Sequence, residues 1–419
     1  MNMNSGIVVQ RSEAQEIKKL GGWILIAGRR KVGKTYLIKN FLNYDAYFLV
    51  KKDRSIHAEG LPISRIDTLD AFVGAVKDLI SNEKCVVIDE FQRLPLNFLE
   101  EIATLHPHGK LVLSGSSLRV MKEIFGEKSP LLGLVQPYIL SMAKARDVLD
   151  SLVKTMPAKA AIEIAPYVRD PWTIPIYIGD DKDFLYNLAK SSKLIVPALI
   201  REIFTEEDRE LTNTYSSILA LIGAGTYDYS EIANILYTRG ILKRQDTSLV
   251  IPYIRNMEAA GILEGVRVYG TNKKRYRLSS AAMELFYYID SRYDLEERDV
   301  SFDEMAPALE NIRNLHIENF LADLLAETLG GRKELIKSAG MEIDILITKR
   351  NKPVFVGEVK WGKLEKKDVE NFIEKTRKFS CRKAIIFKTL HSFSGAKGTG
   401  IDIISPDGLV AFLKAARTP

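Results

Sequence analysis

The chain has 419 residues, which is too long for a single compact core and predicts roughly two to four domains. Hydrophobic residues make up 46% and charged residues 27%, the usual proportions of a soluble globular protein, and no stretch has the apolar length of a membrane span. The formal charge of +6 permits a nucleic-acid partner without establishing one, and we expect no membrane partner.

The N-terminus and the cysteines indicate the cellular compartment in which we expect the protein. Residues 1–20 lack a basic region followed by an apolar core, so we expect no secretory signal. Cys85 and Cys381 lie far apart in apolar, strand-like runs, which is typical of buried core residues in a reducing compartment rather than of a disulfide. The five histidines show no zinc spacing. We therefore expect a cytoplasmic protein.

A glycine-rich segment between a strand and a helix is the strongest signal in the sequence. The apolar run Trp23–Ala27 predicts a buried strand, and the amphipathic run Tyr36–Leu42 predicts a helix. Between them lies the segment 28–35, GRRKVGKT, which has the spacing of a phosphate-binding loop. A glycine turn that happens to carry a lysine is the alternative, but it does not require this spacing in this context.

Four residues of this loop each have their own expected role in binding a nucleotide. Gly28 and Gly33 let the backbone N–H groups turn toward an anion, and the start of the helix adds its positive dipole end. Lys34 is expected to contact the β- and γ-phosphates of ATP, and Thr35 to offer its hydroxyl to Mg²⁺. The sequence therefore predicts a nucleoside triphosphate site at this loop.

The next elements alternate between strands and helices. Residues 46–51 predict a second strand, and apolar positions at helical spacing predict a helix over 67–80. The run Cys85–Ile88 predicts a buried parallel strand that ends at Asp89 and Glu90, where open α/β sheets bind ligands. Asp89 is expected to hold Mg²⁺, and Glu90 to orient and deprotonate the attacking water. An ordinary strand end with two acids is the alternative.

The remaining core elements complete a parallel sheet. We expect a helix at 95–105, a strand at 111–113 and a last strand at 135–140. Five strands in the order 5-1-4-3-2 would place one strand between the loop strand and the acid strand. Ser114 or Ser116 then has the position of a γ-phosphate sensor, but both serines can equally cap the following helix. The residues expected to bind ATP are Gly28, Arg29, Arg30, Lys31, Val32, Gly33, Lys34, Thr35, Tyr36 and Asp89.

Three segments of this core carry a combined pattern: GRRKVGKT at 28–35, VVIDEFQRLP at 86–95 and LVLSGSSLRVM at 111–121. Together they resemble the archaeal ATPase family, in the STAND class of AAA+-like NTPases. The resemblance implies an ATP-binding and ATP-hydrolysing core followed by a helical lid. Residues 142–205, which read as helices with short loops, match the lid position.

Two positions depart from the family pattern. The family usually places an arginine after Pro-Leu-x-Gly, where this chain has Leu134, and a Gly-x-Pro motif in the lid, where the best match is 173–175, Thr-Ile-Pro. Arg119 or Arg93 can supply a charge to the γ-phosphate, with an ordinary surface position as the alternative for both. These departures leave open which residue senses the nucleotide.

Residues 206–300 show a different pattern of predicted helices and strands. Helices are expected at Tyr215–Ile222, Tyr229–Leu236 and 249–260, followed by two strands, 262–268 and 273–278, that a turn connects. Three helices and a basic hairpin form a winged helix, which the resemblance also implies. The residues expected to contact DNA are Arg255, Asn256, Lys273, Lys274, Arg275 and Arg277. The alternative is a winged helix that packs on the ATPase without binding DNA.

Residues 301–419 predict a small α/β domain. A helix at 310–329 ends at Gly330, and a hairpin joins strands 342–347 and 354–360. Side chains alternate along a strand, so Glu358 and Lys360 share a face that Asp344 can reach. Two carboxylates and a lysine can hold a divalent metal and position water against a phosphodiester, and Glu318 is a possible further ligand.

This C-terminal arrangement resembles the PD-(D/E)xK nuclease superfamily, including a helix over 366–379 and a strand over 384–387. The resemblance implies catalytic roles for Asp344, Glu358 and Lys360, although Ile343 replaces the usual proline. A retained but silent fold is the alternative, because Glu-x-Lys pairs are frequent in hairpins.

The predicted architecture is therefore an α/β P-loop ATPase core (1–141), a helical lid (142–205), a winged helix with its connector (206–300) and a restriction-endonuclease-like domain (301–419). We expect Mg²⁺ and ATP as cofactors and DNA as a partner, with a further protein partner or self-assembly possible. The main alternative is a STAND-type nucleotide switch that binds DNA or protein without cutting.

Overall fold

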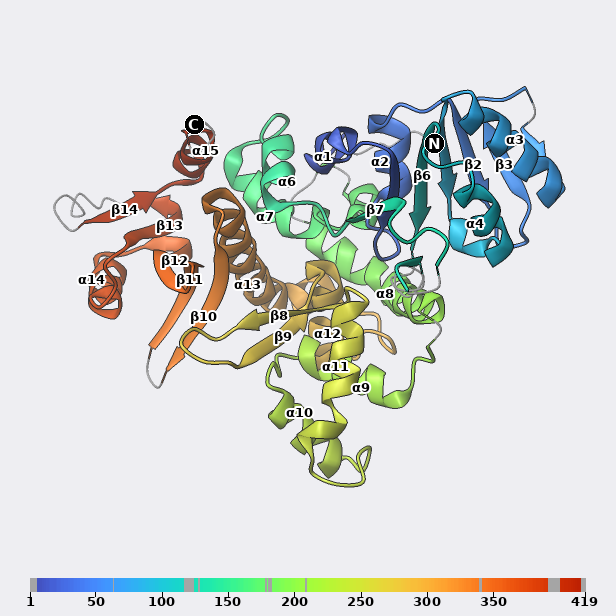
Figure 1. The fold of residues 1–419 in the computed structure, drawn as a ribbon. Coiled ribbons are helices and arrows are strands. Elements are labelled where there is room, and N and C mark those ends of the chain that lie inside the picture. The colour runs from blue at the N-terminus through green and yellow to red at the C-terminus, as the bar shows by residue number, and fades with distance from the viewer. Residues whose placement is uncertain are drawn as a thin grey trace.

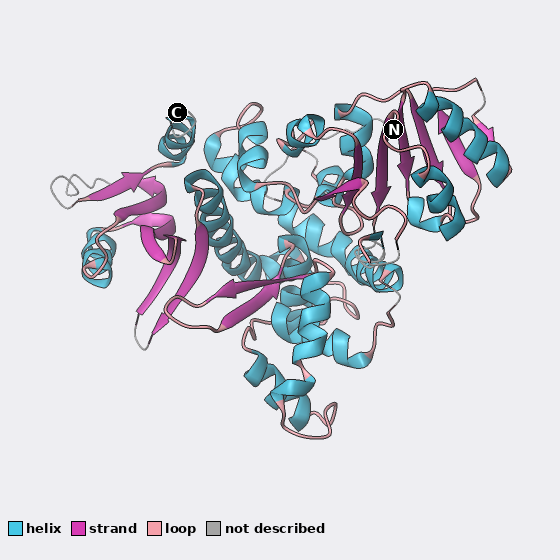
Figure 2. Ribbon diagram, in the orientation of Figure 1, coloured by secondary structure: helices cyan, strands magenta, loops and turns pink. Residues whose placement is uncertain are grey.

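The computed structural model of the chain describes residues 6–62, 64–116, 124–126, 129–177, 179, 183–207, 209–338, 341–390 and 400–415. A seven-stranded sheet lies at the N-terminal end of the molecule and a five-stranded sheet at the C-terminal end (Figure 1). Helices and a two-stranded hairpin separate the two sheets, as the colouring by secondary structure shows (Figure 2).

The N-terminal sheet has the strand order β4-β3-β2-β5-β6-β1-β7. Its strands are β1 (Trp23–Ala27), β2 (Ala46–Val50), β3 (Ile56–Glu59), β4 (Arg65–Ile66), β5 (Cys85–Asp89), β6 (Lys110–Gly115) and β7 (Val135–Ile139). The pairs among β2, β5, β6, β1 and β7 are parallel, which confirms the predicted order 5-1-4-3-2. The sequence analysis did not predict β3 and β4, which extend the sheet by antiparallel pairing at one edge.

Helices cover both faces of this sheet and bury two apolar clusters. The helices of this region are α1 (Glu13–Lys19), α2 (Lys34–Phe41), α3 (Leu69–Ser81), η1 (Phe91–Arg93) and α4 (Leu96–Ala103). On one face, Phe72 of α3 stacks on Phe98 of α4 and meets Phe48 of β2 edge to face. On the other face, Leu37 and Ile38 of α2 pack into the second cluster, which fixes α2 directly behind the loop.

The helical region between the sheets shares one continuous core with part of the C-terminal sheet. Its elements are α6 (Ala145–Leu152), α7 (Ala158–Val168), η2 (Pro171–Ile176), α8 (Phe184–Glu206), α9 (Asn213–Gly223), α10 (Tyr229–Thr238), η3 (Thr247–Leu249), α11 (Ile251–Ala259), β8 (Leu263–Arg267), β9 (Lys274–Leu278), α12 (Ala281–Tyr293) and α13 (Phe302–Leu329). The predicted three helices and hairpin are thus present as α9, α10, α11, β8 and β9.

The C-terminal sheet has the order β10-β11-β12-β13-β14. Its elements are β10 (Arg332–Ser338), β11 (Met341–Lys349), β12 (Lys352–Leu364), α14 (Lys366–Thr376), β13 (Arg382–Leu390), β14 (Ile401–Ile404) and α15 (Pro406–Ala415). The predicted antiparallel hairpin is β11–β12, and β12, β13 and β14 run parallel. The helix α13 packs on β11 and ends at Gly330, which has φ +60°, as predicted (Figure 1).

The structure bears on two predictions from composition, one about membrane-spanning helices and one about the cysteines. No helix in the described part of the chain combines the length and apolar character needed to cross a membrane. Cys85 and Cys381 are both free, but each is half-buried rather than fully buried as expected.

Candidate functional site

The glycine loop connects β1 to α2 and surrounds the side chain of Lys34. This lysine is the first residue of α2, and its Nζ donates hydrogen bonds to the carbonyl oxygens of Gly28 (2.7 Å) and Arg29 (3.2 Å). The side chain is buried, and burial lowers the pKa of Lys34, an effect that Glu90 and Asp89 oppose. The ammonium group therefore lies inside the loop, where the sequence analysis expected a phosphate.

The acid strand β5 places Asp89 against the start of α2. Asp89 is fully buried, and its Oδ2 accepts hydrogen bonds from the hydroxyls of Thr35 (2.7 Å) and Tyr47 (2.8 Å). The structure therefore brings together the two residues predicted to hold Mg²⁺. The sequence analysis missed Tyr47, although its place in the neighbouring strand β2 put it within reach of this carboxylate.

Glu90 follows Asp89 in a left-handed backbone conformation, with φ +58°. Its Oε2 lies 2.9 Å from Nε2 of Gln92, 3.0 Å from Nη2 of Arg93 and 3.4 Å from Oγ of Ser116. Arg93 is thus held by Glu90 rather than directed freely into the site. Gln92, which also donates to Ser116 (3.3 Å), was not assigned a role from the sequence.

The two predicted sensor serines differ in position. Ser116 is at the end of β6 and lines the same cavity as Lys34, whereas Ser114 is fully buried within the sheet between Ile26 and Asp89. The structure therefore favours Ser116 at the site. The helix that these serines were expected to cap, and Arg119, fall in 117–123, outside the described residues.

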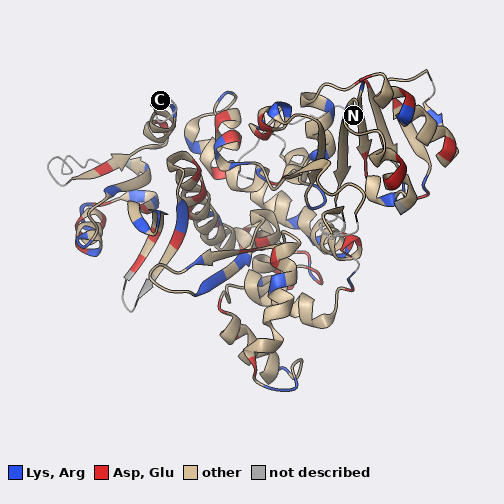
Figure 3. Cartoon of the chain, viewed as in Figure 1, with Lys and Arg blue, Asp and Glu red and all other residues tan. Residues whose placement is uncertain are grey.

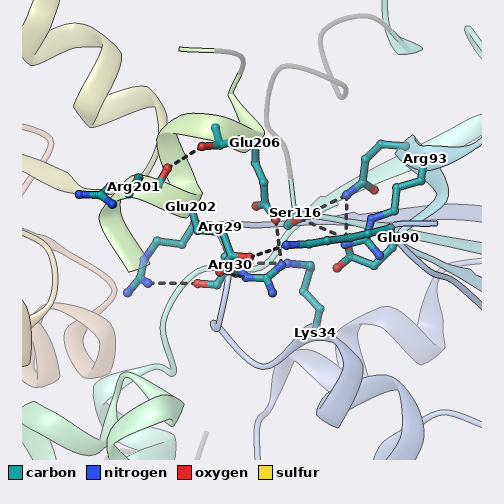
Figure 4. Close-up of polar contacts among 12 residues, drawn as sticks. Arg29, Arg30, Lys34, Glu90, Arg93, Ser116, Arg201, Glu202 and Glu206 are labelled. Carbon is teal, nitrogen blue, oxygen red and sulfur yellow. Dashed lines mark hydrogen bonds and ion pairs between the residues drawn. The ribbon is translucent and has the colours of Figure 1, made fainter. Parts of the chain in front are cut away.

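The loop arginines contact the helical region. Arg29 and Asp170, both buried, form an ion pair of 2.6 Å, and Arg30 pairs with Glu202 (2.5 Å) and Glu206 (3.0 Å) of α8 (Figure 4). The remaining loop residues differ in exposure: Val32 is buried, Lys31 is exposed and Tyr36 is half-buried.

Arg11 is a further loop contact, which the sequence did not signal. Its guanidinium donates to the carbonyl oxygens of Val32 (2.7 Å) and Ser141 (2.8 Å). Because Ser141 follows β7, Arg11 ties the loop to the far edge of the parallel sheet. Arg11 is itself buried and paired with Glu13 at 2.7 Å.

A cavity of about 490 Å³ opens at the loop. Polar residues line one part of it, and these are Arg11, Arg30, Lys31, Lys34, Thr35, Glu90 and Ser116. Apolar residues of the N-terminal segment and of η2 line the rest, including Val9, Trp172, Ile174 and Pro175. The segment 173–175, which departs from the family's Gly-x-Pro motif, therefore still borders the site. A cavity with a cationic part and an apolar part suits a nucleotide.

The comparisons with known proteins concern the region just described. Residues 21–133 match the AAA domain family. The match begins just before the strand β1 and includes the glycine loop, the acid strand β5 and the two serines predicted as sensors. No curated protein matches the chain.

Solved structures with some similarity to the whole chain include two from Aeropyrum pernix. The ORC2 protein (ADPNP-ADP complexes) is 14% identical over 73% of this chain and 94% of its own, with a TM-score of 0.39. The ORC1 protein in complex with DNA is 14% identical over 68% and 93%, with a TM-score of 0.31. A STAND protein with a tetratricopeptide repeat sensor from Pyrococcus horikoshii is 15% identical over 78% and 50%, with a TM-score of 0.30. At these TM-scores the similarities carry no further argument.

A second polar constellation lies in the C-terminal sheet, remote in sequence from residues 21–133. Asp344 of β11 and Glu358 of β12 face each other, and Oδ2 of Asp344 accepts a hydrogen bond from the backbone N–H of Val359 (2.7 Å). Lys360 lies 3.4 Å from Oε1 of Glu358, and so does Lys375 of α14, which the sequence analysis did not include. Glu358 is buried, and its Oε2 has no hydrogen-bond partner among the described residues.

The carboxylates of this constellation influence one another. Burial and the nearby charge of Glu358 raise the pKa of Asp344 to about 6. Burial, together with Asp344 and Glu358, raises the pKa of Glu318 on α13 to about 8. The structure thus brings the four predicted residues into one neighbourhood, although no three His, Cys, Asp or Glu side chains among the described residues are grouped closely enough to hold a metal ion.

The basic hairpin β8–β9 is the third candidate site, and lysines and arginines are concentrated on β9 (Figure 3). Arg255 and Lys273 are exposed, whereas Lys274 pairs with Glu258 at 2.9 Å and Asn256 donates to the hydroxyl of Tyr215 at 2.8 Å.

Arg277 differs from the other predicted contacts. Its side chain is only 14% exposed and pairs with Glu264 (2.9 Å) and Asp323 (3.6 Å). Because these carboxylates enclose the guanidinium, Arg277 is less available to a phosphate than the exposed Arg255 and Lys273.

Proposed function

We propose that the AAA domain binds ATP with Mg²⁺ and hydrolyses it. The observation that carries this proposal is the hydrogen bond between Thr35 and the buried Asp89, beside the ammonium group of Lys34. A hydroxyl and a carboxylate at this distance suit a magnesium ion, and the ion would neutralise charge on the β- and γ-phosphates. Lys34 would exchange its loop carbonyls for phosphate oxygens.

Glu90 is the proposed general base for the attacking water. Its carboxylate borders the cavity beside Ser116, and Gln92 and Arg93 orient it. A base must be held within hydrogen-bond reach of the water that it deprotonates, and these contacts supply that positioning. Ser116 is the proposed sensor of the terminal phosphate, because its hydroxyl lines the same cavity.

The test is calorimetric titration with ATP and Mg²⁺, together with steady-state measurement of phosphate release. We expect Lys34→Ala to abolish binding, and Glu90→Gln to retain binding and to lower turnover by about 100-fold or more. Lys77→Ala is the matched control, because Lys77 of α3 pairs with Glu101 on the surface. Unchanged ATP affinity in Lys34→Ala would remove the proposal.

A second function, metal-dependent cleavage of DNA, is favoured by the constellation of Asp344, Glu358 and Lys360. The partnerless Oε2 of Glu358 and the carboxylate of Asp344 would supply two ligands to a divalent cation, and water would supply the others, because no third such side chain among the described residues is grouped closely enough with them. The cation would polarise a phosphodiester and lower the pKa of bound water. Lys360, paired with Glu358 and Asp368, would stabilise charge on the phosphate.

This second proposal is tested with duplex DNA, single-stranded DNA and RNA in Mg²⁺ or Mn²⁺, each with and without ATP. We expect metal-dependent cleavage that disappears in Lys360→Ala and persists in Lys363→Ala, whose lysine is exposed on the same strand. Cleavage in none of these conditions, with ATP still hydrolysed, would favour the alternative of a STAND-type nucleotide switch with a silent C-terminal domain.

DNA binding by the region of α11, β8 and β9 would connect these activities. The proposed contacts are Arg255, Asn256, Lys273, Lys274 and Arg275, in a winged helix within 206–300 between the lid (142–205) and the nuclease-like part (301–419). Exposed cations contribute affinity for phosphates without reading bases. We also propose that the protein is cytoplasmic and that it assembles with a protein partner or with further copies of itself.

A further inference from the structure

Arg30 stands out among the arginines around the proposed nucleotide site. Its Nε lies 2.5 Å from Oε2 of Glu202, and its Nη1 lies 3.0 Å from Oε1 of Glu206. The two glutamates are four residues apart on α8, so they occupy the same face of that helix. One guanidinium of the glycine loop therefore joins the loop to the C-terminal end of α8 (Figure 4).

The position of this bridge relates it to the phosphates. Arg30 lines the same cavity as Lys34, Thr35 and Glu90. Glu206 is close enough to Lys34 to influence its ammonium group and contributes to raising the pKa of Lys34, against the larger effect of burial. A triphosphate held by Lys34 would therefore approach the guanidinium of Arg30 from the cavity that both residues line.

Three other arginines near the site are less free to bind a phosphate. Arg11 is 7% exposed, pairs with Glu13 and donates to the carbonyl oxygen of Val32. Arg29 is 5% exposed and pairs with Asp170, which is 1% exposed, so releasing it would leave a buried carboxylate without its cation. Arg93 pairs with Glu90 and also donates to the carbonyl oxygen of Val50 at 2.7 Å. The side chain of Arg30 is 23% exposed, and its partners Glu202 (31%) and Glu206 (16%) are also in contact with solvent.

We propose that Arg30 distinguishes ATP from ADP by exchanging the carboxylates of α8 for the γ-phosphate. This inference rests on the proposed ATP site and assigns to Arg30 the charge that the family arginine, absent at Leu134, would supply. A guanidinium presents several N–H donors in one plane and can bind phosphate or carboxylate oxygens in pairs. ADP lacks the phosphate that would compete with Glu202 and Glu206, so it leaves the bridge to α8 intact.

The exchange has a consequence for α8. Without Arg30, two carboxylates and the negative dipole end of the helix would face the triphosphate, and this repulsion favours movement of α8 away from the loop. Helix α8 packs on α12 and leads through the residues after Glu206 into α9. The nucleotide state is thereby linked to the helices of the proposed winged helix.

The test compares the affinities for ADP and for a non-hydrolysable ATP analogue, both with Mg²⁺, by titration calorimetry. We expect Arg30→Ala to lower the affinity for the analogue by about tenfold or more and the affinity for ADP by less than about twofold. The double variant Glu202→Gln with Glu206→Gln should bind the analogue several-fold more tightly, because the competing carboxylates are gone. Arg30→Lys keeps the charge without the planar fork and should fall between the wild type and Arg30→Ala.

Two matched controls isolate the bridge. Arg201→Ala changes an arginine of the same helix that points away from the loop (Figure 4), and Glu101→Gln changes a carboxylate that pairs with Lys77 on the surface. Both should retain the wild-type ratio of affinities. The inference would be overturned if Arg30→Ala had the wild-type ratio of affinities for the analogue and for ADP, whether or not both affinities fell. Loss of binding in Lys34→Ala with normal wild-type affinity would show that the ATP site itself is sound, whereas a wild type that binds neither nucleotide would remove the site and the inference together.

Discussion

At the scale of single residues, Gly28 shows how tightly the glycine loop is fitted to the sheet. A Cβ atom added at this position would lie 2.0 Å from the carbonyl oxygen of Leu140, which follows β7. The backbone N–H of Leu140 in turn donates to the carbonyl oxygen of Ala27 at 2.6 Å, so this strand end has little room to retreat. Any side chain at position 28 must therefore displace either the loop or the end of β7.

We expect Gly28→Ala to weaken ATP binding by at least about tenfold and to lower the free energy of unfolding by about 1–3 kcal/mol, the usual cost of overpacking. Gly74 provides the control, because it lies within α3 with nothing within 4 Å of an added Cβ. Gly74→Ala should leave binding unchanged and stabilise the fold by about 0.5–1 kcal/mol. Calorimetry and urea denaturation measure both effects, and equal affinities in the two variants would contradict the prediction.

Glu318 gives a second prediction at this scale, concerning pH. Its carboxyl has a pKa of about 8 in the folded protein against an ordinary value of 4.5. Between these values the folded protein holds a proton that the unfolded chain releases, so the free energy of unfolding falls as the pH rises through this window. The stabilisation by the protonated form is complete below pH 4.5 and is lost as the pH passes 8.

Glu318→Gln should remove this dependence, because glutamine imitates the protonated carboxyl at every pH. We expect the variant to match the wild type near pH 5 and to exceed its stability by about 1–3 kcal/mol near pH 8.5, measured by urea denaturation in EDTA. The control is Glu310→Gln on the same helix, since Glu310 is 68% exposed and should keep the wild-type slope. Parallel pH profiles for the wild type and Glu318→Gln would refute the prediction.

At the scale of elements, the apolar strands and amphipathic helices could be predicted, and several short or polar strands could not. The strand β1 is buried at every position, so its pattern is visible in the sequence. The strands β3, with the sequence IHAE, and β10, with RKELIKS, are short or polar and depend on a neighbouring strand for their hydrogen bonds. Helix α13 begins at Phe302 rather than 310, and the missed signal was the cap, where Ser301 accepts a hydrogen bond from the N–H of Glu304.

One element contact that the sequence could not show is the charge cluster around Asp323 of α13. Asp323 pairs with Arg169 after α7 (2.5 Å), with Lys333 of β10 and with Arg277 of β9 (3.6 Å). These three cations hold the pKa of Asp323 far below its ordinary value, against the opposing effect of burial. The cluster therefore joins α7, α13, the hairpin and the C-terminal sheet.

We expect Asp323→Ala to destabilise the protein by about 3–5 kcal/mol, because it removes the carboxylate paired with Arg169 and leaves Arg277 and Lys333 to share Glu264. Asp402→Ala is the control, since Asp402 and its partner Arg382 are both 48% exposed, and its effect should stay within about 1 kcal/mol. Thermal or urea unfolding distinguishes the two. A cost for Asp323→Ala as small as for Asp402→Ala would show that water replaces the lost carboxylate.

At the scale of the whole molecule, the described regions are less separate than the predicted boundaries suggest. A single apolar core includes residues of α6 to α8, of α9 to α13 and of one face of the C-terminal sheet. The tip of the hairpin also pairs with β10, because the N–H of Tyr269 donates to the carbonyl oxygen of Leu335 at 2.8 Å. Sequence patterns predict the faces that are buried, but the partner of each face depends on packing between segments far apart in the chain.

This packing suggests a physical connection between the nucleotide loop and the C-terminal part. Arg29 of the loop pairs with the buried Asp170, and the adjacent Arg169 pairs with Asp323 of α13. Displacement of the loop by a bound nucleotide would thus act on two consecutive residues at the end of α7.

Asp170→Asn tests the connection, since it weakens the contact with Arg29 and leaves Arg169 in place. In the wild type, we expect ATP to alter the hydrogen exchange of backbone amides in α13 and β10, whereas in Asp170→Asn the change should remain within the AAA domain. The variant Asp147→Asn is the control, because Asp147 accepts hydrogen bonds from Ser12 near the N-terminus and contacts neither arginine in the described structure. If ATP changes exchange in α13 equally in the wild type and in Asp170→Asn, the signal does not pass through this ion pair, and α8, which Arg30 contacts, becomes the remaining route.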